Sequence, residues 1–293
     1  MPFDITLWQA FALLAKVLVY AGSSLAMGTL MFRLFVERAQ SHHQPGFIIT
    51  AALIALIAGG AQILIQSGRL MDDGMAGVMD TEIWSLVAGT PLGTSVGLRS
   101  LGLMLLIIGT LRLASLWPLA AVGVVATALS FPMVGHATND PSWWLTVLIT
   151  VHVLCLAFWI GGLLPLHRAA SASPAPEAGR LAHRFGQQAM WAVAVLTVAG
   201  GWTAYTLVGS FQNLVGTTYG QVLLVKLGTV ALLLGLAALN KLRLVPALSA
   251  GDPTAGPALQ TSIRFEAVAF IAIFALTAIL TTVLSLPTAM EGT

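Results

Sequence analysis

Long apolar runs follow one another along almost the whole chain, and short polar segments separate them. A run of about 20 apolar residues can cross a hydrocarbon layer about 30 Å thick, where only helices or closed barrels satisfy the backbone. Because the runs are continuous and do not alternate with polar residues, they predict helices. We therefore predict an all-α polytopic membrane protein with eight transmembrane helices, over residues 7–36, 46–68, 94–113, 116–135, 142–167, 184–208, 219–241 and 264–286.

The composition supports this fold class. Hydrophobic residues make up 57% of the chain and charged residues 8%, against roughly 25% charged residues in soluble domains. The longest segments between predicted spans, 169–183 and 245–262, are rich in Pro, Ala, Gly and Ser and are predicted to be flexible linkers. The single cysteine, Cys155, excludes an internal disulfide and a CxxC metal motif. No nucleotide-binding motif is present, and we expect a transport protein rather than an enzyme.

Basic residues divide unevenly between the two sides of the predicted helices. The start of the chain has Asp4 and lacks the basic region of a signal peptide, so the first span is predicted to stay in the protein. If both termini lie outside, only Arg69 and Arg99 fall at outer positions, while most other basic residues fall at inner loops and helix ends. The positive-inside rule then predicts both termini on the outer side of the membrane, which would be the periplasm for a bacterial inner membrane. The net charge of +2 thus reflects topology, and we expect membrane lipid, not nucleic acid, as a partner.

Three short matches relate the two halves of the chain. They are in register with the predicted spans, and an even number of spans per half makes the repeats parallel. The matched pairs are 58–60 with 199–201, 90–99 with 217–226, and 129–132 with 284–287. We predict a 4+4 internal duplication with halves 1–140 and 141–293. The first half has additional residues in an outer loop over 69–93.

Three methionines lie four residues apart in this outer loop, at Met71, Met75 and Met79, with carboxylates around them. Thioether sulfur favours Cu(I), so the loop is a candidate site for copper capture. The same methionines also fit one apolar face with a period of 3.6 residues, as in an amphipathic helix at a membrane surface. Residue types alone leave both interpretations open.

Two histidines occupy positions of interest. His136 lies at the outer end of the fourth span, and His152 lies about ten residues into the fifth, roughly 15 Å deep and near the middle of a bilayer. An ionisable group at that depth indicates function. His152, Cys155 and Trp159 share one helix face, and imidazole and thiolate both suit copper. An interhelical hydrogen bond from His152, with Cys155 as a small apolar residue, is the alternative.

The first span has a stripe about 100° wide that faces one direction. Its members are Lys16, Tyr20, Ser23, Ser24, Met27 and Met31. The stripe suits the wall of a path for a soft ion, with Met27 and Met31 as ligands, or packing against neighbouring helices. Arg99 and Lys226, near the outer boundary, do not favour a bare cation. They would suit a lipid head group, a haem propionate or a carboxylate of a partner.

Several of these motifs together resemble those of the CopD/PcoD copper-resistance membrane proteins. In the region 184–287 they are Arg184-Phe185, Gly200-Gly201, Thr217-x-Tyr219-Gly220, Lys226, Asn240 and Arg264-x-Glu266. The first half adds Thr90-x-x-Gly93, Arg99, the histidine of Gly135–Ala137, and His152 with Trp159–Gly162. The resemblance implies an inner-membrane protein of copper homeostasis that moves copper from periplasm to cytoplasm. It also implies a separate periplasmic copper donor of the CopC type.

Two functions follow as expectations. In the first, the methionine loop concentrates copper, His136 receives it, and His152 passes it inward with Cys155 and the first-span methionines. In the second, the protein binds b-type haem through His136 and His152, and Arg99 or Lys226 neutralises the propionates. The predicted duplication counts against two equivalent haem sites, because Glu291 takes the place of His136 in the second half.

Overall fold

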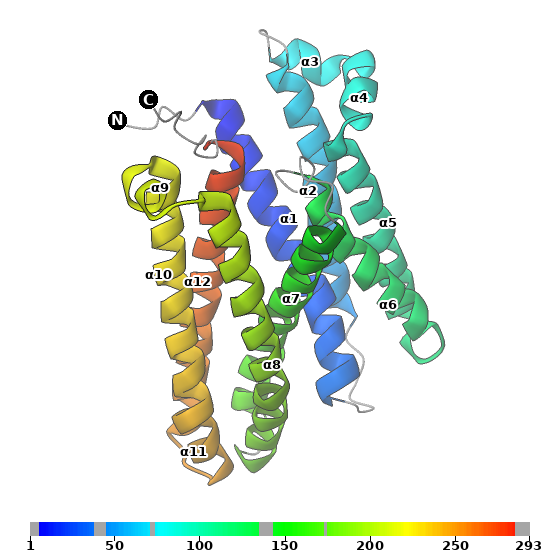
Figure 1. Cartoon of the computed structure of the whole chain (residues 1–293). Helices are drawn as coiled ribbons and strands as arrows, with labels where there is room; N and C mark the ends of the chain where they lie inside the picture. The colour runs from blue at the N-terminus through cyan, green and yellow to red at the C-terminus, as the bar shows by residue number, and fades with distance from the viewer. Residues whose placement is uncertain (1–5, 38–44, 71–73, 135–142, 173–174, 285–293) are drawn as a thin grey trace. The chain divides into compact units, whose positions relative to one another are not determined.

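The chain is all-helical in a computed structural model, which describes residues 6–37, 45–70, 74–134, 143–172 and 175–284 (Figure 1). The long helices are α1 (Leu7–Phe32), α2 (Gly46–Arg69), α5 (Pro91–Leu111), α6 (Leu113–Leu129), α7 (Trp143–Ala172), α8 (Ala175–Val208), α10 (Thr218–Leu239) and α12 (Ala255–Thr282). The short elements are η1 (Arg33–Glu37), α3 (Met75–Met79), α4 (Thr81–Ala88), η2 (Phe131–Met133), α9 (Phe211–Gly216), η4 (Asn240–Leu244) and α11 (Val245–Ser249). The prediction of an all-α fold is confirmed.

Within the described residues, seven helical segments are long and apolar enough to cross a membrane. They are Leu7–Glu37, Gly46–Arg69, Pro91–Leu111, Ser115–Met133, Trp143–Ser171, Thr218–Ser249 and Ala255–Thr282. The protein is therefore a polytopic membrane protein, as predicted. The remaining predicted span, 184–208, lies on α8, where glutamine, glycine and threonine residues interrupt the apolar sequence. The count of eight spans and the duplication stay predictions.

Two compact units make up the chain. Unit 1 contains residues 1–27, 44–154 and 281–283, and unit 2 contains 28–43, 155–280 and 284–293. Helices α1, α7 and α12 each contribute residues to both units. These units are defined by contacts, so the division into two repeat halves stays a prediction.

Small residues bring helices α5 and α6 of unit 1 into close contact. A Cβ atom added at Gly123 would lie 2.5 Å from the backbone nitrogen of Leu106, and one added at Gly109 would meet the backbone of Ala120 at the same distance. In lipid, helix pairs gain little from apolar burial and associate through such close packing. Glycines such as Gly109 and Gly123 therefore allow α5 and α6 to pack closely as a helical hairpin.

In unit 2, the end of α1 packs against α7 in the same way. Cβ atoms added at Gly28 or Gly161 would overlap the backbone of the opposite helix. Beside this contact the Thr29 hydroxyl lies 3.5 Å from the carbonyl oxygen of Gly161, to which it donates a hydrogen bond. No side chain other than hydrogen fits at either glycine.

The predicted linkers are largely helical, which corrects the expectation of flexible segments. Residues 175–183 are the first turns of α8, and 245–249 and 255–262 belong to α11 and α12. Pro246 lies directly after the π-helical segment Asn240–Leu244, and Pro176 and Pro257 lie in the first turn of a helix. Proline is tolerated there because the first amide groups of a helix have no intrahelical partner. Proline content was therefore a poor indicator of flexibility here.

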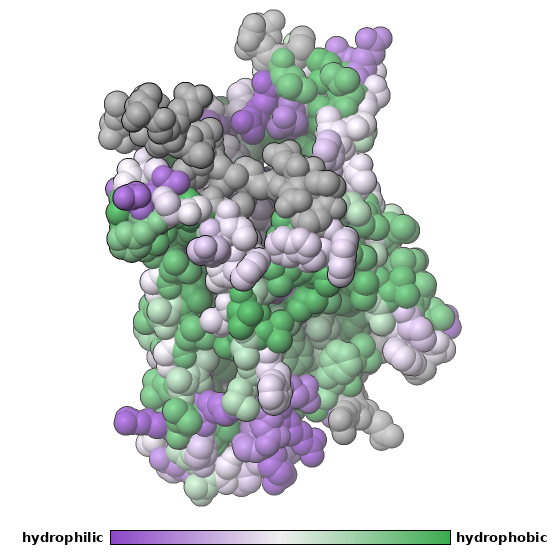
Figure 2. All heavy atoms as spheres, viewed as in Figure 1, coloured by the Kyte–Doolittle hydropathy of each residue, from purple (hydrophilic) through white to green (hydrophobic). Residues whose placement is uncertain are grey.

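In unit 2, apolar side chains lie along the length of the helices and hydrophilic side chains gather at one end. Figure 2 shows apolar residues along the lengths of α8 and α10 and hydrophilic residues gathered near α11. Lys241 and Arg243 lie in η4 at this α11 end. An apolar belt that ends in basic residues is the pattern expected of helices that leave a membrane.

Candidate functional site

The loop over 69–93 contains two short helices, α3 and α4. Asp80 has an extended backbone, with φ −91° and ψ 110°, and separates α3 from α4. Its Oδ1 atom accepts hydrogen bonds from the amides of Glu82 and Ile83 at 2.8 and 3.4 Å. Aspartate is a preferred N-cap because its side chain satisfies free amides of the first turn. The helix that carries Met75 and Met79 therefore ends before Asp80, and a second helix follows it.

Both described methionines of the loop are open to solvent or lipid. Met75 is 60% exposed and Met79 is 73% exposed, and they begin and end α3. With a spacing of four residues they share one face of the helix. Met71 lies outside the described residues. The exposure is compatible with both earlier interpretations of the loop, so copper capture stays a prediction.

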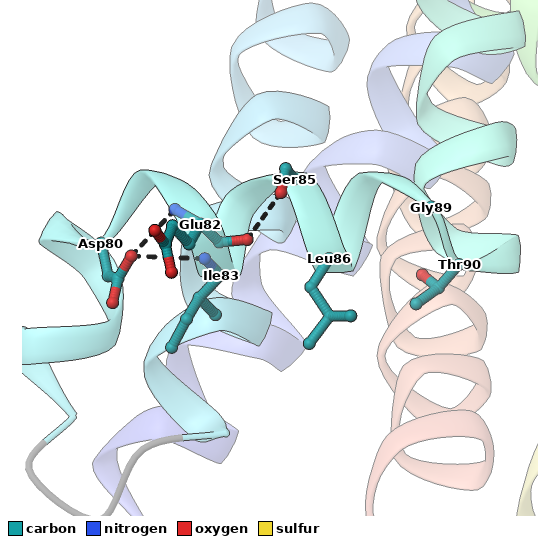
Figure 3. Close-up of a pocket in the computed structure, with 7 residues that line it drawn as sticks. All are labelled: Asp80, Glu82, Ile83, Ser85, Leu86, Gly89 and Thr90. Atoms are coloured by element: carbon teal, nitrogen blue, oxygen red, sulfur yellow. Dashed lines mark hydrogen bonds between the residues drawn. The ribbon is translucent and has the colours of Figure 1, made fainter.

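An open hollow of about 730 Å³ runs along α4 (Figure 3). Its lining residues are Asp80, Glu82, Ile83, Ser85, Leu86, Gly89 and Thr90. Figure 3 shows the Asp80 carboxylate bonded to the start of α4 and the Ser85 hydroxyl bonded to the Glu82 carbonyl oxygen. The hollow thus combines two carboxylates with apolar side chains, one of which is Leu86.

The polar stripe of the first span is turned into the protein. Ser23, Ser24 and Met27 are buried, and Met27 has an exposed fraction of 0%. Met31, one turn further along α1, is half-buried. The stripe therefore faces protein and not lipid, as a path for an ion requires.

The predicted ligands on α7 are both half-buried. His152 and Cys155 lie three residues apart on this helix, and the Cys155 thiol is free. His136 lies outside the described residues, so the proposed transfer between His136 and His152 stays a prediction. Among the residues with a described position, no group of three His, Cys, Asp or Glu side chains is arranged to hold a metal ion.

Arg99 is a buried cation of unit 1, with 6% of its surface exposed. Its Nε donates to the Ser130 hydroxyl at 3.0 Å and one terminal nitrogen donates to the Ser95 hydroxyl at 2.8 Å. The guanidinium carbon lies 4.7 Å from the centre of the Phe131 ring. A planar guanidinium can make both contacts at once, because its donors lie in a plane that also stacks on an aromatic ring.

Lys16 is another cation of unit 1, which also contains Arg69 and Arg112. Its Nζ donates to the Thr281 carbonyl oxygen at 2.9 Å and to the Thr281 hydroxyl at 3.0 Å. Tyr20, one turn along α1, stacks on the Phe131 ring, with 5.9 Å between ring centres. Within the described part of the chain, the ion pair between Arg33 and Glu37 is the one salt bridge, so neither Lys16 nor Arg99 has a carboxylate partner there.

Unit 2 contains a buried carboxylate, Glu266, which belongs to the Arg264-x-Glu266 motif but was not among the predicted site residues. Glu266 lies on α12 with 3% of its surface exposed. The Trp159 indole donates to its Oε2 atom at 3.1 Å, and the Asn240 side-chain amide donates to Oε1. A carboxylate within an apolar span indicates function by itself. That signal was present in the sequence, but the partners of Glu266 were not.

The two Thr-x-x-Gly motifs each start a long helix directly after a short one, but Thr217 alone also accepts a hydrogen bond from the amide of its motif glycine. The Thr90 hydroxyl donates to the Val87 carbonyl oxygen, and the Thr217 hydroxyl donates to that of Asn213. A Cβ atom at Gly93 or Gly220 would overlap the backbone of the preceding short helix. Each glycine therefore lets a long helix start directly against the helix before it. The similarity is local, and the relation between the halves stays a prediction.

Comparisons with known proteins match two parts of the chain to protein families. Residues 6–147 match the family described as copper resistance protein D-like, N-terminal domain, and residues 179–280 match copper resistance protein D. The chain is 28% identical over 215 residues to the inner membrane protein YebZ of Escherichia coli K12. That alignment covers 71% of this chain and 73% of YebZ. No solved structure matches the chain significantly.

Proposed function

The chain belongs to the copper resistance protein D family, and we propose that it transports copper across the bacterial inner membrane from periplasm to cytoplasm. The observation that carries the proposal is that the two family domains together span most of the chain. The similarity to an inner membrane protein supports the proposed location. The basic residues at the α11 end of unit 2 support an orientation with that end in the cytoplasm.

The proposed path uses soft ligands that bind copper in turn. Met71, Met75 and Met79 would collect Cu(I) at the outer face, and a periplasmic donor protein of the CopC type would supply it. His136 and His152 would then carry the ion inward. Thioether and imidazole groups both suit Cu(I), and several weak sites allow release where one tight site would retain the ion.

The buried stripe of α1 continues this path. Met27 and Met31 lie four residues apart, so both sulfur atoms fall on the same side of the helix. The hydroxyl of Ser23 is buried and has no hydrogen-bond partner in the described part of the chain, which leaves it free to contact a passing ion or its water. Cys155 on α7 would add a thiolate or thiol ligand in the inner half.

Binding of b-type haem is the second candidate function. The observation in its favour is the pair of cations in unit 1, Lys16 and Arg99, whose described partners are hydroxyl and carbonyl oxygens. Propionate groups of a haem would complement such a pair, and His152 would be an axial ligand.

Uptake of copper into proteoliposomes tests the leading proposal. Purified protein is reconstituted, copper is supplied outside as Cu(I) with a reductant, and metal inside the vesicles is measured over time. We expect uptake well above that of protein-free vesicles and above that of vesicles with an unrelated helical membrane protein. Uptake equal to these controls at every copper concentration would contradict transport.

A further inference from the structure

Among the described residues of unit 2, Glu266 is the one buried carboxylate. It is held from two directions, by Trp159 of α7 and by Asn240, the first residue of η4. Trp159 is itself 3% exposed and packs edge-on against Phe270, with 5.5 Å between ring centres and an interplanar angle of 88°. This packing fixes the position of the indole nitrogen, so the fold itself holds the Trp159 donor against Glu266.

Within the described residues, no cation forms an ion pair with this carboxylate. The other titratable and charged residues on the four elements around it are His152, Cys155, His167 and Arg168 of α7, Tyr219 and Lys226 of α10, Lys241 and Arg243 of η4, and Arg264 of α12. The hydrogen bonds described for Glu266 come from Trp159 and Asn240. Arg264 contacts His167 instead, and Lys241 contacts the sulfur of Met190.

The hydrogen-bonding groups around Glu266 can satisfy both protonation states. An ionised carboxylate only accepts, and the Trp159 and Asn240 nitrogens supply one donor to each oxygen. A protonated carboxyl needs an acceptor for its O–H. The Asn240 Oδ1 atom is buried and has no partner in the described part of the chain. Rotation of the Asn240 side-chain amide by half a revolution places Oδ1, an acceptor, where the Nδ2 donor lies. Little else has to move, because the two ends of the amide have nearly the same shape.

The backbone around Asn240 also departs from regular structure. Residues Asn240–Leu244 form a π-helical segment between α10 and α11. Such segments are rare and occur frequently at functional sites. The Ser262 hydroxyl is buried without a described partner, and Ser262 lines an open hollow of about 500 Å³ between η4 and α12. Ser262 lies four residues before Glu266 on α12, so the two side chains fall on the same side of that helix.

We propose that Glu266 is a proton-binding site that exchanges its proton with the α11 end of unit 2 past Asn240 and Ser262. One proton from water adds to a carboxylate oxygen on binding and returns to water on release, and no other bond changes. The second part of the inference rests on the proposed copper transport. Copper uptake depends on the pH at the α11 end through this one residue.

Infrared difference spectroscopy of the copper-free protein in nanodiscs tests the proton site directly. As the pH is lowered, we expect the wild-type protein to gain the carbonyl band of a protonated carboxyl in an apolar environment. The band must be absent in Glu266→Gln and retained in the control Glu177→Gln, which changes an exposed carboxylate in the first turn of α8. A band that survives in Glu266→Gln, or no such band in the wild type, overturns the proposal.

A second variant covers the case in which Glu266→Gln does not fold. Asn240→Leu leaves the carboxyl in place and removes both the donor and the acceptor of the amide. We expect the carbonyl band to persist at a shifted frequency, because the protonated carboxyl loses its hydrogen-bond acceptor. An unchanged band in Asn240→Leu contradicts the role of Asn240 and overturns the proposal.

Measurements of copper uptake show whether the proton-binding inference fails or the proposed transport function fails. With the inner pH of the vesicles varied, wild-type copper uptake is expected to change by up to about tenfold per pH unit, the limit for a single titrating group. In Glu266→Gln the uptake should be independent of inner pH. Copper uptake with equal pH dependence in both proteins removes the coupling. Absence of uptake in the wild type contradicts the transport proposal, while the infrared result still decides the proton site.

Discussion

Replacement of Arg99 by lysine should destabilise the protein more than replacement by methionine. The guanidinium makes two hydrogen bonds and lies over Phe131. Charge-assisted hydrogen bonds contribute about 1.5–3 kcal/mol each, and a desolvated cation–π contact contributes about 2 kcal/mol. A lysine ammonium is a point donor that cannot bond both serines and stack on the ring. Arg99→Lys therefore keeps the buried charge but loses about 3 kcal/mol of its stabilisation.

Arg99→Met removes the charge together with its contacts. The two serine hydroxyls keep their other bonds, because Ser95 donates to the Ser130 carbonyl oxygen and Ser130 donates to that of Thr127. No buried donor is left unsatisfied, and exchange of a buried charge for an apolar side chain of similar volume is often close to neutral. We expect the free energy of unfolding of Arg99→Met to be within about 1 kcal/mol of the wild type.

Unfolding in mixed micelles with increasing fractions of sodium dodecyl sulfate, followed by far-ultraviolet circular dichroism, measures this order. Arg99→Lys should unfold at a lower fraction of the denaturing detergent than Arg99→Met. The opposite order would refute the reasoning, since it would mean that the positive charge itself is needed. A required charge would indicate an anionic partner for Arg99, such as a propionate, and would favour the second candidate function.

Three further predictions concern the loop, the helix contact in unit 2 and the cofactor. Replacement of Met71, Met75 and Met79 by leucine keeps the apolar face and removes the thioethers. Copper uptake should therefore fall at low copper concentration and recover at high concentration. Uptake equal to that of the wild type at all concentrations would show that the methionines serve only as apolar residues. Gly161→Val should prevent folding or lower the unfolding free energy by more than about 4 kcal/mol, because its side chain overlaps the backbone at Gly28, and a normal yield of stable protein would contradict the observed contact. The visible spectrum of the purified protein should lack a Soret band, and stoichiometric haem would contradict the leading function.

The positions of the helices could be predicted because a helix that crosses a membrane needs a continuous run of about 20 apolar residues. Seven predicted spans coincide with described helices that are apolar enough to cross a bilayer. The limits were less accurate at α8 and α12, which begin at Ala175 and Ala255, well before the predicted spans. Alanine-rich sequence with proline in the first turn continues a helix beyond the apolar region, and hydropathy does not detect this.

The tertiary partners of buried polar residues could not be predicted. Trp159 and Glu266 are 107 residues apart in the sequence, and Asn240 and Glu266 are 26 apart. Periodicity places Trp159 on a face with Cys155, but it does not reveal which helix that face meets. In the same way, Arg99 was recognisable as an unusual charge near a span boundary, whereas its bonds to Ser95 and Ser130 required the structure.

The most direct test of the central claim is copper uptake by a His136→Ala, His152→Ala double variant in proteoliposomes. The control is His183→Ala, which changes a histidine of α8 whose described hydrogen bond is to Gln187, away from the proposed path. Transport through the two histidines predicts that the double variant, correctly folded by circular dichroism, loses most copper uptake while the control keeps it. Unchanged uptake in the double variant would contradict the proposed path.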